Sequence, residues 1–181
     1  MMLVILTVPA TGQEQVRPQG LWGRAVFGMG RVTQSCDSCK FSGTLTASNF
    51  NLAGGYAFPA LAFGLEFGSI NYQGNRGGVS LTLFTLAWYP WKSSGAFLKA
   101  GAGGSTFRGT TLADGIREEQ GHGFGAQFGI GYDLSMGDLG ITPILFAQYA
   151  HQAATLAYGV LPGSRDLTQW DVGLGVGITV F

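Results

Sequence analysis

The stretch LTQWDVGLGVGITVF (Leu167–Phe181) alternates apolar residues with small or polar ones. Its apolar members are Trp170, Val172, Leu174, Val176, Ile178 and Val180. Because successive side chains of a strand point to opposite faces, this period of two predicts a long strand with one apolar face and one narrow face. A strand that crosses a bilayer as part of a closed barrel needs about 9–11 residues of this kind, with the apolar face toward lipid.

The composition of the chain agrees with a membrane barrel. Only 11% of its 181 residues are charged, against about 25% in ordinary soluble domains. The 10 basic and 10 acidic residues give no net charge, so no nucleic-acid partner is expected. The 31 glycines alternate with apolar residues, as in Phe124 to Tyr132, which suits a curved sheet whose inner face has little room.

Seven other stretches resemble the last one, and no helical apolar stripe interrupts them. The eight predicted strands are Leu21–Val32, Ser48–Phe58, Leu61–Tyr72, Val79–Tyr89, Ala96–Phe107, His122–Leu134, Ile141–Gln152 and Leu167–Phe181. Short connections alternate with longer ones, and the long polar ones are Thr33–Ala47, Arg108–Gly121 and Ala153–Asp166. Short turns on one side and long loops on the other are typical of outer-membrane barrels.

We therefore expect an all-β fold, an eight-stranded antiparallel transmembrane β-barrel over residues 21–181, integral to the bacterial outer membrane with both termini on the periplasmic side. Residues 13–20 form a short N-terminal segment. Residues 1–12 contain an apolar run, Leu3–Val8, and the small-x-small site Ala10-Thr11-Gly12. This is interpreted as the tail of a secretory signal peptide, cut before Gln13; the alternative is an ordinary apolar N-terminal segment.

Aromatic residues gather near the predicted strand ends, where aromatic side chains collect at the two bilayer interfaces. The predicted girdle is Trp22, Phe58, Tyr89, Trp91 and Tyr132 at the short-turn side, with Tyr72, Tyr149 and Trp170 at the long-loop side.

Alternation places four charged residues in the lumen, with two glutamines beside them. These are Arg24, Glu66, Lys99 and Asp171, with Gln127 and Gln148. An eight-stranded barrel is just wide enough for side chains to fill it. Buried charges are costly unless paired, so we expect a neutral, salt-bridged lumen; the alternative is a proton or ion path.

The pair Cys36 and Cys39 lies in the first long connection. In an exported protein this pair predicts a loop disulfide. A redox centre would need an α/β context, and a zinc site would need further ligands close by. The two histidines, His122 and His151, lie far along the chain. No metal and no cofactor are expected.

His151 lies at the outer end of the seventh predicted strand. The outer-membrane lipid A deacylases resemble this chain in size and use a histidine. Those enzymes use a serine two residues after the histidine, and Ala153 occupies that position here. We therefore expect no enzymatic activity.

The chain resembles the small outer-membrane β-barrel domain family, the OmpA/OmpX-like and opacity-protein-like group, over about Leu21–Phe181. The resemblance depends on the eight-strand layout, Gly140–Ile144 (GITPI), Gly129–Asp133 (GIGYD) and the terminal Phe181. It implies that Phe181 takes part in recognition by the barrel assembly machinery. Here Thr179, Gly177 and Gly175, rather than apolar residues, are in phase with Phe181.

The leading functional hypothesis is a non-enzymatic, monomeric surface barrel. Its partners would be outer-membrane lipid or lipopolysaccharide and a surface partner bound through the loops, for adhesion or envelope contacts. The alternatives are a narrow porin or channel for small solutes or ions, and a soluble lipocalin-like ligand-binding barrel. A soluble barrel needs a polar exterior, which this pattern does not provide.

Overall fold

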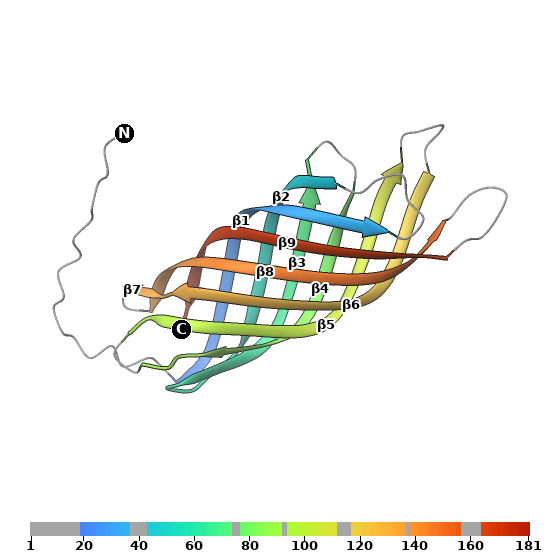
Figure 1. Cartoon of the computed structure of the whole chain (residues 1–181). Helices are drawn as coiled ribbons and strands as arrows, with labels where there is room; N and C mark the ends of the chain where they lie inside the picture. Colours follow the sequence, from blue (N-terminus) through green and yellow to red (C-terminus); the bar gives the residue numbers. More distant parts are fainter. Residues whose placement is uncertain are drawn as a thin grey trace, which may run out of the picture.

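The computed structural model describes residues 19–36, 43–73, 77–91, 94–111, 117–136, 138–156 and 164–181. These residues form one antiparallel sheet rolled into a barrel (Figure 1). Its strands are β1 (Gly20–Cys36), β2 (Gly43–Ala57), β3 (Leu61–Tyr72), β4 (Gly77–Trp88), β5 (Ala96–Thr111), β6 (Arg117–Tyr132), β7 (Leu134–Met136), β8 (Leu139–Leu156) and β9 (Ser164–Val180). Within the described ranges, no helix is long and apolar enough to cross a membrane.

The barrel is closed, because every long strand pairs with two neighbours. Consecutive strands pair from β1 to β6, β1 also pairs with β9, and β6 also pairs with β8. The short β7 pairs only with β8 and continues the line of β6 beyond Asp133. With β6 and β7 counted as one interrupted strand, the wall consists of eight strands. The predicted eight-stranded antiparallel barrel is confirmed.

The strands extend further toward the long connections than predicted. β1 and β2 remain paired up to Gln34 and Gly43, and β5 pairs with β6 up to Thr111 and Arg117. Most of the predicted loops Thr33–Ala47, Arg108–Gly121 and Ala153–Asp166 is therefore strand, which corrects their boundaries. The apolar alternation stops in these segments, but backbone pairing does not depend on apolar side chains and continues without it.

The short connections lie at one end of the barrel, here called the turn end, and the other end is the loop end. At the turn end the chain reverses tightly after β2, where the Phe58 amide donates to the Leu61 carbonyl at 2.7 Å. Both the start of β1 and the end of β9 lie at this end, on the left of Figure 1.

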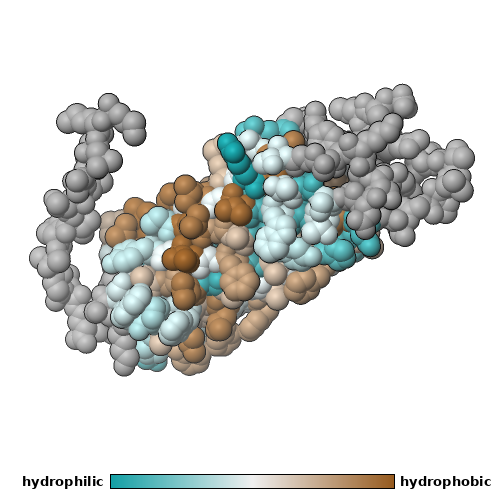
Figure 2. Space-filling model, viewed as in Figure 1, coloured by the Kyte–Doolittle hydropathy of each residue, from teal (hydrophilic) through white to brown (hydrophobic). Residues whose placement is uncertain are grey.

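The exterior of the barrel is apolar. On β3 exposed and buried residues alternate along the whole strand, and Leu65 and Phe67 keep more than half of their surface exposed. On β9 the six apolar residues of the alternating series are all exposed. Figure 2 shows the resulting brown band around the visible face, bounded by paler and teal residues toward the loop end. A barrel that exposes this surface crosses a bilayer, so the soluble lipocalin-like alternative is wrong.

The lumen holds two apolar clusters with polar side chains between them. The cluster at the turn end is Trp22, Val26, Ala53, Ala57, Ala62, Ala87, Tyr89, Phe97, Ile144 and Phe146. The cluster toward the loop end is Val32, Ala47, Ile70, Tyr72, Val79, Leu81, Leu83, Phe107 and Ala150. The lumen is therefore not lined by small and polar residues alone, because Val79, Leu81 and Leu83 of β4 face inward.

Candidate functional site

A buried ion pair closes the turn end of the lumen. The Arg24 Nη2 on β1 lies 3.0 Å from both carboxylate oxygens of Asp133, which follows β6. Both side chains are almost completely buried. The Asp133 backbone amide also donates to the Gly95 carbonyl at 2.9 Å, which fixes the aspartate at the edge of the barrel.

Neighbouring hydroxyl groups complete the hydrogen bonds of this pair. Tyr89 donates to Asp133 Oδ2 at 2.8 Å, and Thr142 donates to Asp133 Oδ1 at 2.6 Å. Arg24 Nε donates to Thr179 Oγ1 at 2.8 Å. A buried charge pair is tolerated when further hydrogen bonds satisfy its remaining atoms, as they do here. The cluster Arg24, Tyr89, Asp133, Thr142 and Thr179 is called the turn-end network below.

Aromatic rings cover the guanidinium from the side. The Arg24 Cζ lies 4.5 Å from the centre of the Phe97 ring and 5.6 Å from that of Trp22. Such cation–π contacts are worth more when the cation is desolvated. They also fill the lumen around the ion pair.

Asp133 is not among the site residues selected from the sequence, although the alternation of its strand would have placed it in the lumen. It is an even number of positions from Gln127, so alternation places both in the lumen, and both are about 1% exposed. Asp133 was not selected because it lies beside a predicted turn, where an aspartate is equally well explained as a turn residue.

A second buried ion pair joins β3 and β5. Lys99 Nζ contacts Glu66 Oε2, and both side chains are buried. The other carboxylate oxygen, Glu66 Oε1, has no hydrogen-bond partner among the described residues.

These contacts correct the predicted network of Arg24, Glu66, Lys99 and Asp171. All four side chains face the lumen, but Arg24 pairs with Asp133, and Asp171 belongs to neither pair. The register explains this: Arg24 lies opposite Thr179 on β9, whereas Asp171 lies opposite Val32. Eight residues along a strand correspond to roughly 26 Å, which separates Arg24 from Asp171.

The middle of the lumen carries buried polar side chains whose hydrogen bonds are incomplete. Atoms without a partner among the described residues belong to Asn49, Gln127, Gln148, Gln152, Gln169 and Asp171. Gln148 Nε2 donates to Asn51 Oδ1 at 3.4 Å, and Gln169 Oε1 accepts from the Tyr72 hydroxyl and from Gln34 Nε2, the latter at 3.3 Å. Buried polar atoms without protein partners are usually satisfied by water or an ion.

Three residues of the predicted girdle face the lumen instead of lipid. Trp22, Tyr72 and Tyr89 are only 8%, 6% and 3% exposed. They are an even number of positions from Arg24, Ile70 and Ala87, which face inward, so alternation turns them inward as well. The Trp22 indole N–H donates to the Phe63 carbonyl at 3.3 Å.

The other girdle residues face outward. Phe58, Trp91, Tyr132 and Trp170 are exposed, and Tyr149 is half-buried against Trp170, with ring centres 4.8 Å apart. Tyr56 and Trp88 are also exposed at the turn end and were not selected from the sequence.

Phe181 follows the inward phase, as its neighbours Thr179 and Gly177 predict. Its ring packs against the turn-end apolar cluster, and its amide donates to the Asp138 carbonyl at 3.1 Å. The predicted disulfide between Cys36 and Cys39 and the predicted signal peptide in residues 1–12 lie outside what the structure describes. His151 is exposed, with Nδ1 3.0 Å from Thr168 Oγ1.

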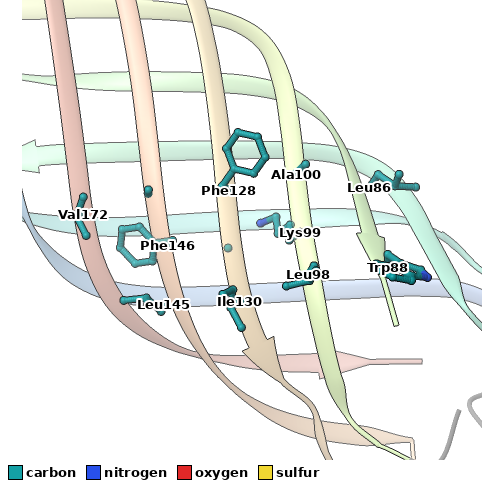
Figure 3. A pocket seen from close by; sticks show the side chains of 12 residues that line it. Leu86, Trp88, Leu98, Lys99, Ala100, Phe128, Ile130, Leu145, Phe146 and Val172 are labelled. Atoms are coloured by element: carbon teal, nitrogen blue, oxygen red, sulfur yellow. The ribbon is translucent and has the colours of Figure 1, made fainter. Parts of the chain in front are cut away.

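An apolar groove of about 480 Å³ runs along the outer wall across β4, β5, β6 and β8 and reaches Val172 of β9. Figure 3 shows Leu98, Phe128 and Ile130 on neighbouring strands around it, with Ala100 between larger side chains. Small outward residues such as Ala100 and Ala147 leave this hollow in a surface of larger side chains. Its lining is apolar, as expected of a wall in contact with acyl chains.

No protein-family model matches the sequence, and no curated protein matches it. Solved structures do match. Neisserial surface protein A (NspA) is similar with a TM-score of 0.51 and 16% identity, covering 89% of this chain and 96% of that one. The outer membrane protein AlkL, solved in lipid bilayers, is similar with a TM-score of 0.50 and 15% identity, covering 98% and 96%. Weaker similarity reaches the Escherichia coli outer membrane protease OmpT, with a TM-score of 0.43, 7% identity and coverage of 93% and 99%.

The fold is therefore that of the small outer-membrane β-barrels, as the sequence predicted. With its apolar exterior, the chain is an integral barrel of the outer-membrane type. Identities this low establish the fold and not the activity.

Proposed function

We propose that the protein is a non-enzymatic outer-membrane barrel that anchors surface segments for adhesion or envelope contacts and does not conduct solutes. The observation that supports this most directly is the turn-end network. Its five side chains are joined by hydrogen bonds across the lumen, from β1 and β9 to Asp133 and β8. A solute would have to break a buried ion pair to pass, which is costly.

The surface role rests on the strands that extend beyond the apolar band at the loop end. β5 and β6 stay paired up to Thr111 and Arg117, and β8 and β9 up to Thr155 and Ser164. Such extensions carry the strand ends beyond the apolar band, where they can contact lipopolysaccharide, a host surface or a neighbouring protein. We expect a monomer that the barrel assembly machinery inserts.

The absence of enzymatic activity remains a prediction, supported by the surroundings of His151. Its ring nitrogen contacts Thr168, and Ala153 occupies the position where a lipid A deacylase would carry serine. The serine that those enzymes use as a partner of the histidine is therefore missing from this position.

A narrow ion channel is the second candidate, and the buried polar side chains in the middle of the lumen favour it. Incomplete hydrogen bonds at Gln127, Gln148 and Gln152 indicate water in this region. Conduction would then require the turn-end network to open.

The test is to refold residues 13–181 into liposomes that contain an entrapped small solute. We expect the folded barrel to shift its gel mobility on boiling and to retain the solute. Release of the solute by wild-type protein would refute the closed barrel and favour the channel. Protein that never inserts into the liposomes would contradict the membrane assignment as a whole.

A further inference from the structure

Arg31 is an exposed arginine on the outer wall, at the loop-end edge of the apolar band. It lies on β1 two residues after the exposed Met29, and Val172 of β9 is directly opposite it. The next outward pair toward the loop end is Thr33 and Trp170. Because aromatic side chains of barrels collect at the headgroup level, Arg31 lies close to that level, among side chains that face lipid. An arginine on a lipid-facing wall is costly in proportion to its depth, unless its charge is compensated.

The acidic side chains that the structure describes do not compensate this arginine. They are Glu66, Asp133, Asp138, Asp166 and Asp171. Three of them are buried in the lumen, and Asp138 lies at the turn end. Asp166 is on the same strand as Val172 but six residues away, which corresponds to roughly 20 Å. None of these acids therefore lies beside Arg31.

Arg31 borders an apolar hollow in the outer wall. The hollow measures about 340 Å³, and its apolar lining comes from three neighbouring strands, with Met29 of β1, Leu145 of β8, and Val172 and Leu174 of β9. Leu145 and Val172 also line the larger groove described above, and both lie at the left of Figure 3. The two hollows therefore form one apolar depression, which begins at a guanidinium and extends toward Trp88 at the turn end.

Exposed hydroxyl groups lie next to the guanidinium. Thr46 of β2 is directly opposite Arg31, and Thr33 is two residues further along β1. Directly opposed residues have Cβ atoms about 4.5–5.5 Å apart. A guanidinium with hydroxyl groups beside it can donate several hydrogen bonds to the oxygens of one phosphate.

We propose that this part of the wall binds lipopolysaccharide, with Arg31, Thr33 and Thr46 on a lipid A phosphate and an acyl chain along the hollow. The loop end of an outer-membrane barrel faces the outer leaflet, where lipopolysaccharide carries its phosphate groups at the membrane surface. A second copy of this chain fits this face less well, because it would press Arg31 against apolar side chains. The site specifies the envelope contact of the proposed function, and it rests on that proposal for the orientation of the barrel.

The test compares the unfolding temperature of the protein, measured from its heat-dependent gel mobility, in vesicles of three compositions. Phosphatidylcholine is the zwitterionic reference. The other two contain phosphatidylglycerol or purified lipid A at the same density of negative charge. We expect lipid A to raise the unfolding temperature by several degrees, and by more than phosphatidylglycerol does, as a ligand of the folded state should. Equal shifts with the two anionic lipids would overturn lipid A as the occupant.

Arg31→Gln should abolish the additional stabilisation by lipid A. Arg31→Lys should retain part of it, because lysine keeps the charge but loses the forked set of donors. Arg108→Gln is the matched control, since Arg108 is an exposed arginine near the loop end of β5 and lines neither hollow. It should keep the wild-type shift. In phosphatidylcholine, Arg31→Gln should unfold at the wild-type temperature or above it, because no charge then remains on this part of the wall.

A lipid A shift that survives in Arg31→Gln would overturn the proposal, as would an equal loss of the shift in Arg108→Gln. Retention of an entrapped solute by the same vesicles tests the closed barrel separately. A barrel that retains the solute but shows no preference for lipid A would lose this site and keep the proposed function. A barrel that leaks but shows the Arg31-dependent shift would lose the closed lumen and keep the site.

Discussion

Arg24 and Asp133 meet 3.0 Å apart at the turn end of the lumen, although 109 positions separate them in the sequence. Arg24 comes from the first strand, and Asp133 from the break between β6 and β7. Their contact therefore joins opposite parts of the wall, and its hydrogen bonds to Tyr89, Thr142 and Thr179 extend across the same level. The ion pair therefore links strands that do not pair with each other, and it can form only when the barrel is closed.

Replacing Asp133 by alanine should strongly destabilise the barrel. The substitution leaves Arg24 buried without its partner, which costs about 3–5 kcal/mol. Urea titrations in detergent, followed by gel mobility, measure the loss. Asp138→Ala is the control, because its side chain is exposed, and a loss of equal size in both variants would show that the pair contributes little.

Lys99→Met should destabilise the barrel or open a leak, because it leaves Glu66 buried and unpaired. Adding Glu66→Gln in the same chain removes the uncompensated charge and should restore much of the stability. A double-mutant cycle in urea, with solute release from liposomes as a second readout, measures this coupling. If both single variants and the double variant melt and leak like the wild type, the pair is not structural.

The period of two was enough to predict the barrel, the facing of Arg24, Glu66, Lys99 and Asp171, and the apolar exterior. It could not predict the partners. Which inward side chains share a level depends on how the strands are staggered around the barrel, and that stagger lies in the register between strands. The predicted network consequently included Asp171 and lacked Asp133, the residue that pairs with Arg24.

The errors in the girdle have a different origin. Trp22, Tyr72 and Tyr89 were assigned to the bilayer interface because they are aromatic and near strand ends, although their phase with Arg24, Ile70 and Ala87 already placed them inside. Phase is the stronger criterion, since a one-residue shift moves a side chain to the opposite face. Residue type contributed less here because a lumen can hold aromatic rings that pack on an arginine.

Gly28→Ala should destabilise the barrel far more than Gly104→Ala. A Cβ at Gly28 would lie 2.7 Å from the Leu174 carbonyl oxygen and 2.9 Å from Phe146 Cε1, whereas one at Gly104 has no neighbour within 4 Å. Overpacking of this kind costs typically 1–3 kcal/mol. Urea midpoints of the two variants, measured side by side, check the difference, and equal midpoints would mean that the wall yields at Gly28.

A charge on the outer wall distinguishes a lipid-facing surface from a solvated one. Leu174 lies near the middle of the apolar series of β9 and is 68% exposed. In a bilayer, Leu174→Arg should cost about 2–4 kcal/mol, against about 0–1 kcal/mol near the interface. Thr44→Arg is the matched variant, because Thr44 is exposed at the loop end of β2. On a surface facing water, both substitutions would stay within about 0.5 kcal/mol of the wild type. The folding free energies of both variants in lipid vesicles therefore test the membrane assignment. We expect Leu174→Arg to be clearly less stable than Thr44→Arg, and equal free energies would contradict the assignment.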